Sequence, residues 1–251
     1  MYIEYSPDIR LQHLIETFWV SDGVISSQHT QRILPDGCVD ILFNFNQIDA
    51  IGQFQSYMPC IVGTMTSYLD ITHYSGAIQM LGIRFRPGGI AAFSRVPVFE
   101  FTNQTVEIDW VETLLEKSCY DRLPEFSTMQ ERIAYLEKYL ISRLDSLFAL
   151  EQRINYTVDF IRKGKGFIPV KQVAQEVCLS ERQLERKFKR AVGVSPKMFS
   201  RIIRFKHTLE YLRTCSDEKH GSVAIDCGYF DHSHLIKDFK AFGGTLPEEL
   251  L

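Results

Sequence analysis

The C-terminal part of this 251-residue chain contains an internal repeat. The spacing Leu-x-x-x-Phe-Lys-x-x-x-Gly-x-x-Pro occurs at residues 184–196 and again at residues 235–247, an offset of 51. Upstream, Val173-Ala174 recurs as Val223-Ala224 at an offset of 50, so one residue has been added in the turn of the second copy. Such a repeat indicates that one supersecondary unit has been duplicated, which restricts the fold more than any other feature.

Each copy predicts two helices separated by a tight turn. In the first copy, at approximately residues 169–192, Pro169 has the favoured first position of a short helix. Ser180 and Gln183 form a Ser-x-x-Gln capping box that begins the second helix, and Gly193 stands where a left-handed C-cap is expected. The first copy is therefore a candidate helix-turn-helix motif.

The second helix of each copy leaves polar and basic side chains opposite its core positions. In the second copy, at approximately residues 222–243, Asp231 is the predicted N-cap. Arginine can pair with guanine through two hydrogen bonds in the major groove, and lysine can contact phosphate. The alternative is a solvated basic face on a generic helical hairpin, which the duplication disfavours. The candidate DNA contacts are Arg182, Gln183, Glu185, Arg186, Lys189 and Arg190 in the first copy, and His232, Ser233, His234 and Lys237 in the second.

Between the copies, Ser195-Pro196 predicts the start of a linker helix that runs to Arg213. Its ~18 residues would span ~27 Å, close to the ~34 Å that separates successive major grooves. Gly164 and Gly166 predict a flexible basic link before the first motif. We expect two domains, residues 1–150 and residues 151–251.

Charge divides the chain in the same place. Residues up to Leu150 include 10 Lys and Arg against 18 Asp and Glu, whereas residues from Glu151 include 18 against 13. The net charges are −8 and +5. A basic segment joined to an acidic one indicates that only the C-terminal part meets a polyanion.

The N-terminal hundred residues predict short strands. Apolar runs are separated by turn formers, and residues 38–45 alternate with Val39, Ile41, Phe43 and Phe45 on one face. Residues 79–86 follow a similar pattern. The expected fold class is α+β, with an N-terminal, mostly-β barrel or sandwich and a C-terminal all-α pair of helix-turn-helix motifs joined by a linker helix.

A helical stripe follows the strands. Its apolar residues recur at helical spacing, and two interpretations stay open: a helix packed on its own barrel, or a dimerisation helix. The stripe consists of Ile133, Leu136, Leu140, Leu144 and Leu147.

No catalytic or metal-binding constellation is recognisable in the sequence. The six cysteines are scattered without a C-x-x-C pair, and His13, His29 and His73 are far apart along the chain. His232 and His234 would point about 200° apart on a helix. We expect no metal, no cofactor and no enzyme activity; a cupin-type enzyme or a protein-interaction module with an accessory DNA-binding domain is the alternative. Without a membrane span or signal peptide, a cytoplasmic protein is expected.

The C-terminal pattern resembles the AraC/XylS family of bacterial transcription regulators from roughly Phe167 to Leu250. The resemblance implies two helix-turn-helix subdomains that read adjacent major grooves of double-stranded DNA. It places base contacts at Arg182, Glu185, Arg186, His232, Ser233, His234 and Lys237. RNA polymerase, a small-molecule effector and a second copy of the chain are further candidate partners. Glu185 and the acidic tail at residues 247–251 depart from a DNA-friendly pattern. The matching positions are Val173, Ala174, Ser180, Leu184, Phe188, Lys189, Gly193, Ser195, Pro196, Arg204, Ala224, Gly228, Tyr229, Asp231, His232, Ser233, His234, Leu235, Phe239, Lys240, Gly244, Thr245 and Pro247.

The N-terminal part resembles the cupin-like effector or dimerisation domain of the same family. Two segments carry this weaker resemblance: Pro35-Asp36-Gly37 before a strand, and Phe85-x-Pro87-Gly88-Gly89 after one. Ordinary surface charges around one packed tryptophan are the alternative to a ligand pocket. The candidate effector pocket consists of Trp19, Asp36, Asp40, Arg84 and Arg86.

Overall fold

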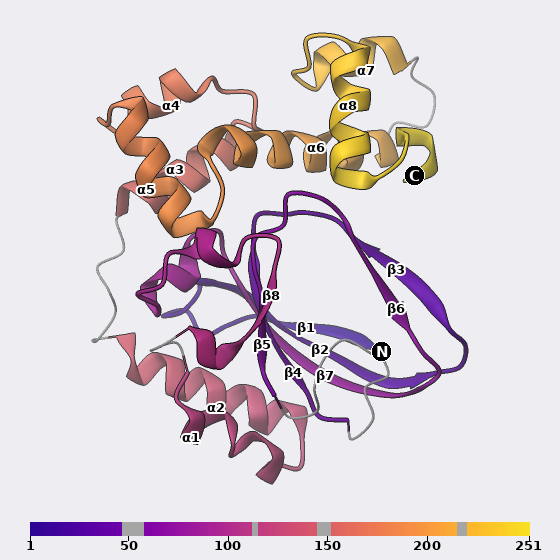
Figure 1. The fold of residues 1–251 in the computed structure, drawn as a ribbon, viewed down its shortest axis with the longest axis vertical. Helices are drawn as coiled ribbons and strands as arrows, with labels where there is room; N and C mark the ends of the chain where they lie inside the picture. Colours follow the sequence, from indigo (N-terminus) through magenta and orange to yellow (C-terminus); the bar gives the residue numbers. More distant parts are fainter. Residues whose placement is uncertain (47–57, 112–114, 145–151, 215–219) are drawn as a thin grey trace.

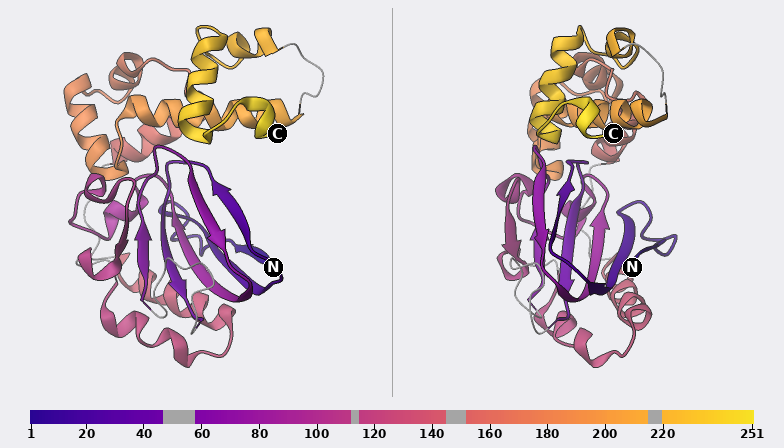
Figure 2. Two further views of the ribbon diagram at one scale, coloured as in Figure 1. Left: turned by 45° about the vertical axis from the view of Figure 1, so that its right-hand side comes forward. Right: turned by 90° about the vertical axis from the view of Figure 1, so that its right-hand side faces the viewer.

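The structure is a computed structural model that describes residues 1–46, 58–111, 115–144, 152–214 and 220–251. It consists of a β part, formed by the residues up to 144, and a helical part, formed by those from 152 (Figure 1). The expected α+β class is confirmed. Figure 2 shows the helical part at one end of the strands, and α2 (Met129–Ser142) at the other.

The described strands of the expected mostly-β part form two sheets. The larger sheet has the order β1-β2-β7-β4-β5-β8, and β3 pairs only with β6. All pairings are antiparallel, and the longest joins β2 to β7 over most of their length. The strands are β1 (Tyr2–Tyr5), β2 (Ile15–Ile25), β3 (His29–Ile33), β4 (Val39–Asn44), β5 (Cys60–Val62), β6 (Leu69–His73), β7 (Gly76–Phe85) and β8 (Thr105–Glu107).

Strand β4 confirms the predicted alternation but is buried on both faces. Val39, Ile41 and Phe43 belong to the main core. Leu42 points to the opposite face and packs with Met80 in a second apolar cluster. The sheet therefore has apolar contacts on each side, whereas the sequence pattern placed apolar residues of this strand on one face.

The helical stripe packs on its own sheet. Ile133, Leu136 and Leu140 of α2 lie in the same core as the β4 and β7 side chains. Thr128 and Glu131 form a capping box at the start of this helix. The first interpretation of the stripe is thus confirmed for these three residues, and Leu147 lies outside the described residues. Short elements connect β7 to α2: η1 (Gly89–Ala92), η2 (Val98–Phe101), η3 (Ile108–Trp110), α1 (Lys117–Tyr120) and η4 (Leu123–Glu125).

The helical part has two apolar cores of its own, one around each motif. The long helix α6 contributes to both, with Phe199 in the first and Phe205 in the second. Its helices are α3 (Gln152–Lys163), α4 (Val170–Glu176), α5 (Glu181–Val192), α6 (Pro196–Thr214), α7 (His220–Asp226), α8 (His232–Gly243) and the single turn η6 (Pro247–Glu249).

The predicted flexible link at Gly164 and Gly166 is instead a packed turn. Gly166 has a φ of 72°, and a Cβ there would lie 2.1 Å from the carbonyl oxygen of Ser200 in α6. Glycine is needed because the two backbones touch. Helix α3, which precedes this turn, contributes Ile154 and Ile161 to the first helical core. The proposed domain boundary between residues 150 and 151 lies outside the described residues.

Within the part of the chain that the structure describes, no helix has the length and apolar character needed to cross a membrane.

Candidate nucleic-acid interface

The first motif is the helix-turn-helix that its sequence predicts. Pro169 is the N-cap of α4, one position earlier than expected. The turn after α4 is closed by the Leu179 amide, which donates to the carbonyl of Ala174 at 3.0 Å. Ser180 then caps α5 by accepting from the Gln183 amide at 3.2 Å. Local hydrogen bonds therefore fix the turn of this motif and the start of α5.

The N-terminal half of α5 carries exposed polar side chains. Arg182, Glu185 and Arg186 are exposed, and Leu184 faces the core. The Gln183 side chain is also exposed, but its amide oxygen accepts from the Ser180 backbone at 3.1 Å as half of the capping box. Three of the four predicted residues in this half thus have side chains available for a partner, and Gln183 is committed to the cap.

The C-terminal half of α5 meets the β part. Arg190 donates to the backbone carbonyl of Arg95 at 3.4 Å, and the Lys189 ammonium lies 5.6 Å from the ring centre of Phe99. A groove of about 590 Å³ runs between this half of α5 and residues 91–99. Basic and apolar side chains line it together, including Arg186. Lys189 and Arg190, two of the candidate DNA contacts, therefore face another part of the same chain.

The second motif repeats the geometry of the first. The Tyr229 amide donates to the carbonyl of Ala224 at 2.8 Å, and Asp231 caps α8 by accepting from the His234 amide at 2.7 Å. His232, Ser233 and Lys237 are exposed on α8. His234 is half-buried, and its ring packs edge-on against Tyr229 at 5.3 Å. The predicted contacts on α8 thus divide into three exposed side chains and one that helps to pack the turn.

A buried carboxylate attaches α8 to the linker helix. Asp238 is fully buried and accepts from Arg201 of α6 at 2.7 Å, with Arg204 3.5 Å away on its other oxygen. Arg204 also donates to the Gly228 carbonyl at 3.2 Å, so it braces the second turn. This network was not predicted from the sequence. A signal was present, because Asp238 lies three residues after core Leu235 on the apolar face of α8, where a buried acidic residue requires a partner.

Both second helices end on the β part. At the end of α5, the hydroxyls of Thr64 and Thr102 donate to the carbonyls of Val192 and Gly193 at 2.6 and 2.9 Å. At the end of α8, Arg32 donates to the Gly243 carbonyl at 2.9 Å. Val192 and Gly243 are equivalent positions of the repeat, 51 residues apart. We call these three contacts the C-terminal attachments; Figure 1 shows both helices directed toward the strands.

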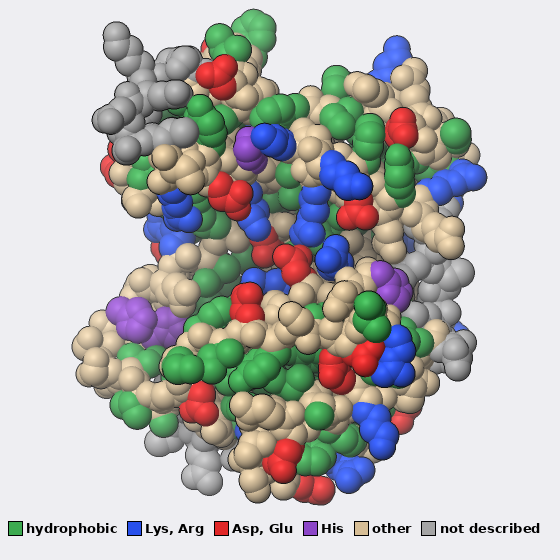
Figure 3. Space-filling view, turned by 180° about the vertical axis from the view of Figure 1, so that it is seen from behind, with side chains coloured by type: hydrophobic (Ala, Val, Ile, Leu, Met, Phe, Trp, Pro, Cys, Tyr) green, Lys and Arg blue, Asp and Glu red, His purple; other side chains and the backbone are tan. Residues whose placement is uncertain are grey.

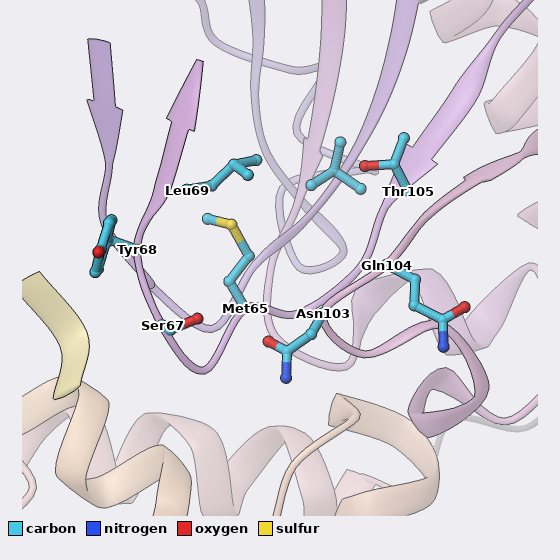
Figure 4. A pocket seen from close by; sticks show the side chains of 8 residues that line it. Met65, Ser67, Tyr68, Leu69, Asn103, Gln104 and Thr105 are labelled. Carbon is cyan, nitrogen blue, oxygen red and sulfur yellow. The ribbon is translucent and has the colours of Figure 1, made fainter. Parts of the chain in front are cut away.

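Arg32 is held in place for this contact. It forms a two-bond ion pair with Asp70 at 2.7 and 2.8 Å, and its guanidinium lies 4.2 Å from the ring centre of Tyr68. The same tyrosine ring would be 2.4 Å from a Cβ at Gly244. Tyr68 also lines a small pocket of about 100 Å³ with Met65 and Asn103 (Figure 4). The attachment of α8 is therefore built from side chains of β3 and of the residues around the start of β6.

The two N-terminal segments that resemble the cupin-like domain also lie at this boundary. A Cβ at Gly37 would be 2.5 Å from the Phe199 ring of α6, and Gly88 lies near Val192 at the end of α5. Glu16 forms an ion pair with Arg162 of α3 at 3.2 Å. Figure 3 shows charged side chains gathered along the same boundary. Contact with the helical part thus gives a structural reason for the glycines of both segments.

The candidate effector residues form one cluster, with one exception. The Trp19 indole donates to Asp40 at 2.9 Å, and the Arg84 guanidinium lies 3.2 Å from Asp40 and 4.0 Å from Asp36. Burial raises the pKa of Asp40 to about 6, with Arg84 opposing the shift. Arg86 makes none of these contacts, and its buried Nε has no hydrogen-bond partner. The cluster is internally paired, and none of the pockets described above includes it.

Two histidines that are distant in the sequence are adjacent in the fold. His29 and His73 are register partners across β3 and β6, and their rings stack at 5.0 Å. Their separation along the chain therefore did not indicate their distance in the fold. Among the residues that the structure describes, no group of three His, Cys, Asp or Glu side chains is arranged to hold a metal ion. Of the cysteines, Cys178 is exposed, four are buried, and Cys215 lies outside the described residues.

The helical part thus contains two helix-turn-helix motifs joined by one linker helix. Residues 173–251 match the family described as a helix-turn-helix domain, and residues 3–107 match a domain of unknown function, DUF6597. A 78-residue stretch is 30% identical to the HTH-type transcriptional regulator ArgR of Pseudomonas aeruginosa. That stretch covers 31% of this chain and 23% of ArgR, so the chain aligns with about a quarter of this relative. Residues 173–251 therefore form a helix-turn-helix domain of the kind found in a DNA-binding transcription regulator.

Similar solved structures include ToxT from Vibrio cholerae, which is 13% identical and has a TM-score of 0.46. The match covers 93% of this chain and 97% of ToxT. The C-terminal domain of AraT from Geobacillus stearothermophilus is 22% identical over 41% of this chain and 86% of that one, with a TM-score of 0.38. An AraC-type regulator from Chromobacterium violaceum is 20% identical over 40% and 89%, with a TM-score of 0.37.

Proposed function

We propose that this regulator binds double-stranded DNA sequence-specifically by inserting α5 and α8 into two successive major grooves. One observation carries the proposal: two 12-residue helices have equivalent caps, equivalent attachments and exposed N-terminal halves. The 19-residue helix α6 between them would be about 28 Å long. This length is compatible with the ~34 Å between successive major grooves.

The proposed base contacts come from the exposed N-terminal halves of the two helices. Arg182 and Arg186 would pair with guanine, and Glu185 would accept from a cytosine amino group. On α8, fewer side chains can form two hydrogen bonds to one base, so its half-site should be read less strictly. The proposed α8 contacts are His232, Ser233, His234 and Lys237.

Phosphate contact is proposed for Lys189 and Arg190, and a lesser role for Gln183. Because Lys189 and Arg190 now lie against Phe99 and Arg95, docking on DNA would have to share or release them. The β part would thereby influence DNA binding directly. Gln183 would act mainly by holding the first turn of α5 in place.

We further propose a division of labour between residues 1–150 and residues 151–251. The helical part should fold and bind DNA alone, since its two cores are built almost entirely from its own side chains. The β part would supply effector response or self-association, and RNA polymerase is the proposed partner at promoters. We expect activity by binding and not by catalysis, in the cytoplasm. Residues 152–251 purified alone should select the same DNA site, whereas residues 1–144 should bind none.

The proposed effector site is the cluster of Trp19, Asp36, Asp40 and Arg84. Arg86, the fifth candidate pocket residue, shares none of the contacts that hold this cluster together. Its support is that a partly buried guanidinium pairs with two carboxylates, one of which also accepts from an indole. A small molecule that displaced either carboxylate would alter the surroundings of Trp19. Quenching or a shift of Trp19 fluorescence in a ligand screen, absent in Trp19→Phe, would identify such a molecule.

The decisive test of DNA reading is selection of binding sites from random duplexes with the full-length protein. We expect one consensus with two protected major grooves about ten base pairs apart on one face. If about six phosphates are neutralised, the slope of log affinity against log salt should be about −5. Affinity that does not depend on salt, or no enrichment of any duplex, would refute the proposed function.

A further inference from the structure

The residue added in the second copy of the repeat can be identified from the turns. Leu179 and Tyr229 are equivalent, because each amide closes its turn on the alanine of the preceding helix. Cys178 and Gly228, one position earlier, share a left-handed backbone, with φ of 53° and 73°. In the first motif the N-cap Ser180 follows at once. In the second, Phe230 intervenes before the N-cap Asp231, so Phe230 is the added residue.

The fold does not use the side chain of Phe230. It is 88% exposed, the highest value among the large apolar side chains described, and it belongs to neither helical core. An apolar residue just before an N-cap commonly packs on the fourth helical residue, here Leu235. Leu235 is already 2% exposed, and Tyr229 has taken the core position in the turn. Stability of the motif therefore gives no reason for a phenylalanine at this site.

The position of Phe230 is continuous with the proposed DNA-reading surface. It lies two residues before exposed His232 and three before exposed Ser233, at the end of α8 opposite to the attachment at Gly243. Figure 1 shows this end of α8 directed away from the strands. Recognition helices contact base edges with their N-terminal residues, so a side chain just before α8 would reach the same groove.

Only one group on the major-groove edges suits a phenylalanine. Guanine, adenine and cytosine present hydrogen-bonding atoms there, whereas thymine also presents its C5 methyl group. We propose that Phe230 is a specificity-determining residue that contacts the C5 methyl group of one thymine in the half-site bound by α8. The inference rests on the proposed function and extends it to an apolar contact. The first motif has no counterpart of Phe230, since its N-cap Ser180 directly follows Leu179.

The test replaces each thymine of the α8 half-site, one at a time, by deoxyuridine, which lacks only the methyl group. Full-length protein and the selected duplex are used. We expect one replacement to weaken binding by about fourfold, the effect of removing one buried methyl-sized group from contact. Phe230→Ala should bind the thymine and deoxyuridine duplexes equally. The control Ile225→Ala, an exposed apolar residue on α7 of the same motif, should keep the fourfold preference.

The outcomes separate the contact from the function on which it rests. If wild-type protein binds the selected duplex but ignores every deoxyuridine replacement, the methyl contact does not exist. If Phe230→Ala keeps the preference, another residue reads the methyl group. If that variant keeps DNA binding and the preference but loses promoter activation, Phe230 serves a protein partner instead. If the wild type enriches no duplex at all, the proposed function itself fails. Unchanged helicity of Phe230→Ala by circular dichroism would verify its fold.

Discussion

Single side chains of the two recognition helices differ in what they can contribute to DNA binding. Arg186 is exposed on the N-terminal half of α5 and can pair with guanine through two hydrogen bonds. Arg186→Ala should cost about 1–3 kcal/mol of binding free energy and relax preference at one base pair. Arg190→Ala should weaken all duplexes alike and reduce the salt slope by about one. Equilibrium titrations with single-base variants of the site would measure both, and reversed effects would exchange the two roles.

Asp40 predicts a distinct pH dependence of stability. Its pKa rises from 3.8 to about 6 on folding because burial disfavours the carboxylate. The folded state therefore holds the proton more tightly, and this stabilisation is present below pH 4 and is lost as the pH rises through 6. The expected loss is about 2–3 kcal/mol. Urea unfolding from pH 4 to 7 should show this fall in wild type relative to Asp40→Asn. Parallel curves for the two proteins would contradict the assignment.

At the level of elements, the helix ends were predictable and the contacts between helices were not. The caps at Ser180, Asp231 and Gly193 depend on residues two to four positions away, so sequence spacing suffices to place them. Asp238 needed knowledge of a second helix, because its partner Arg201 is 37 residues away. Its apolar surroundings in the α8 pattern were the available signal. The sheet pairing of His29 with His73 could not be inferred, since register is a tertiary property.

The buried carboxylate between α6 and α8 predicts a large cost on removal. Asp238→Ala would leave two arginines without their common acceptor in a protein interior. The second motif should lose about 3 kcal/mol of stability, the lower end for breaking a buried ion pair, because Arg201 can still reach solvent. Asp226→Ala, which removes an exposed carboxylate on α7, should change stability little. Thermal unfolding of both variants would check the difference; equal midpoints would show that the ion pairs contribute nothing net.

For the whole molecule, the C-terminal attachments predict that the β part helps to set the distance between the two recognition helices. Arg32→Ala should free the end of α8 while leaving α5 attached through Thr64 and Thr102. We expect the variant to bind the selected site somewhat less tightly. It should also tolerate one inserted or deleted base pair between the half-sites better than wild type. Asp8→Ala, at an ion pair remote from the boundary, is the control. The same spacing preference in all three proteins would exclude this role.

The attachments were beyond the reach of the sequence. Arg32 and Gly243 are 211 residues apart, and Thr64 and Val192 are 128 apart, with no local pattern that connects them. Both N-terminal segments that resembled a cupin-like domain proved to lie on this boundary. The alternation and caps of each part follow from nearby residues, whereas the way the parts meet depends on side chains distributed over the chain.

Helices α5 and α8 each end at a left-handed glycine, and in each helix the attachment to the β part and the proposed selection of DNA lie at opposite ends. The attachments are made to the carbonyls of Val192 and Gly193 in α5 and of Gly243 in α8, which are backbone groups that any sequence supplies. The opposite ends carry the side chains proposed to choose the DNA. Consider an interchange of residues 180–187 with residues 231–238 in which the core positions and Asp238 are kept. It should exchange the two halves of the preferred DNA site and leave the C-terminal attachments of both helices unchanged.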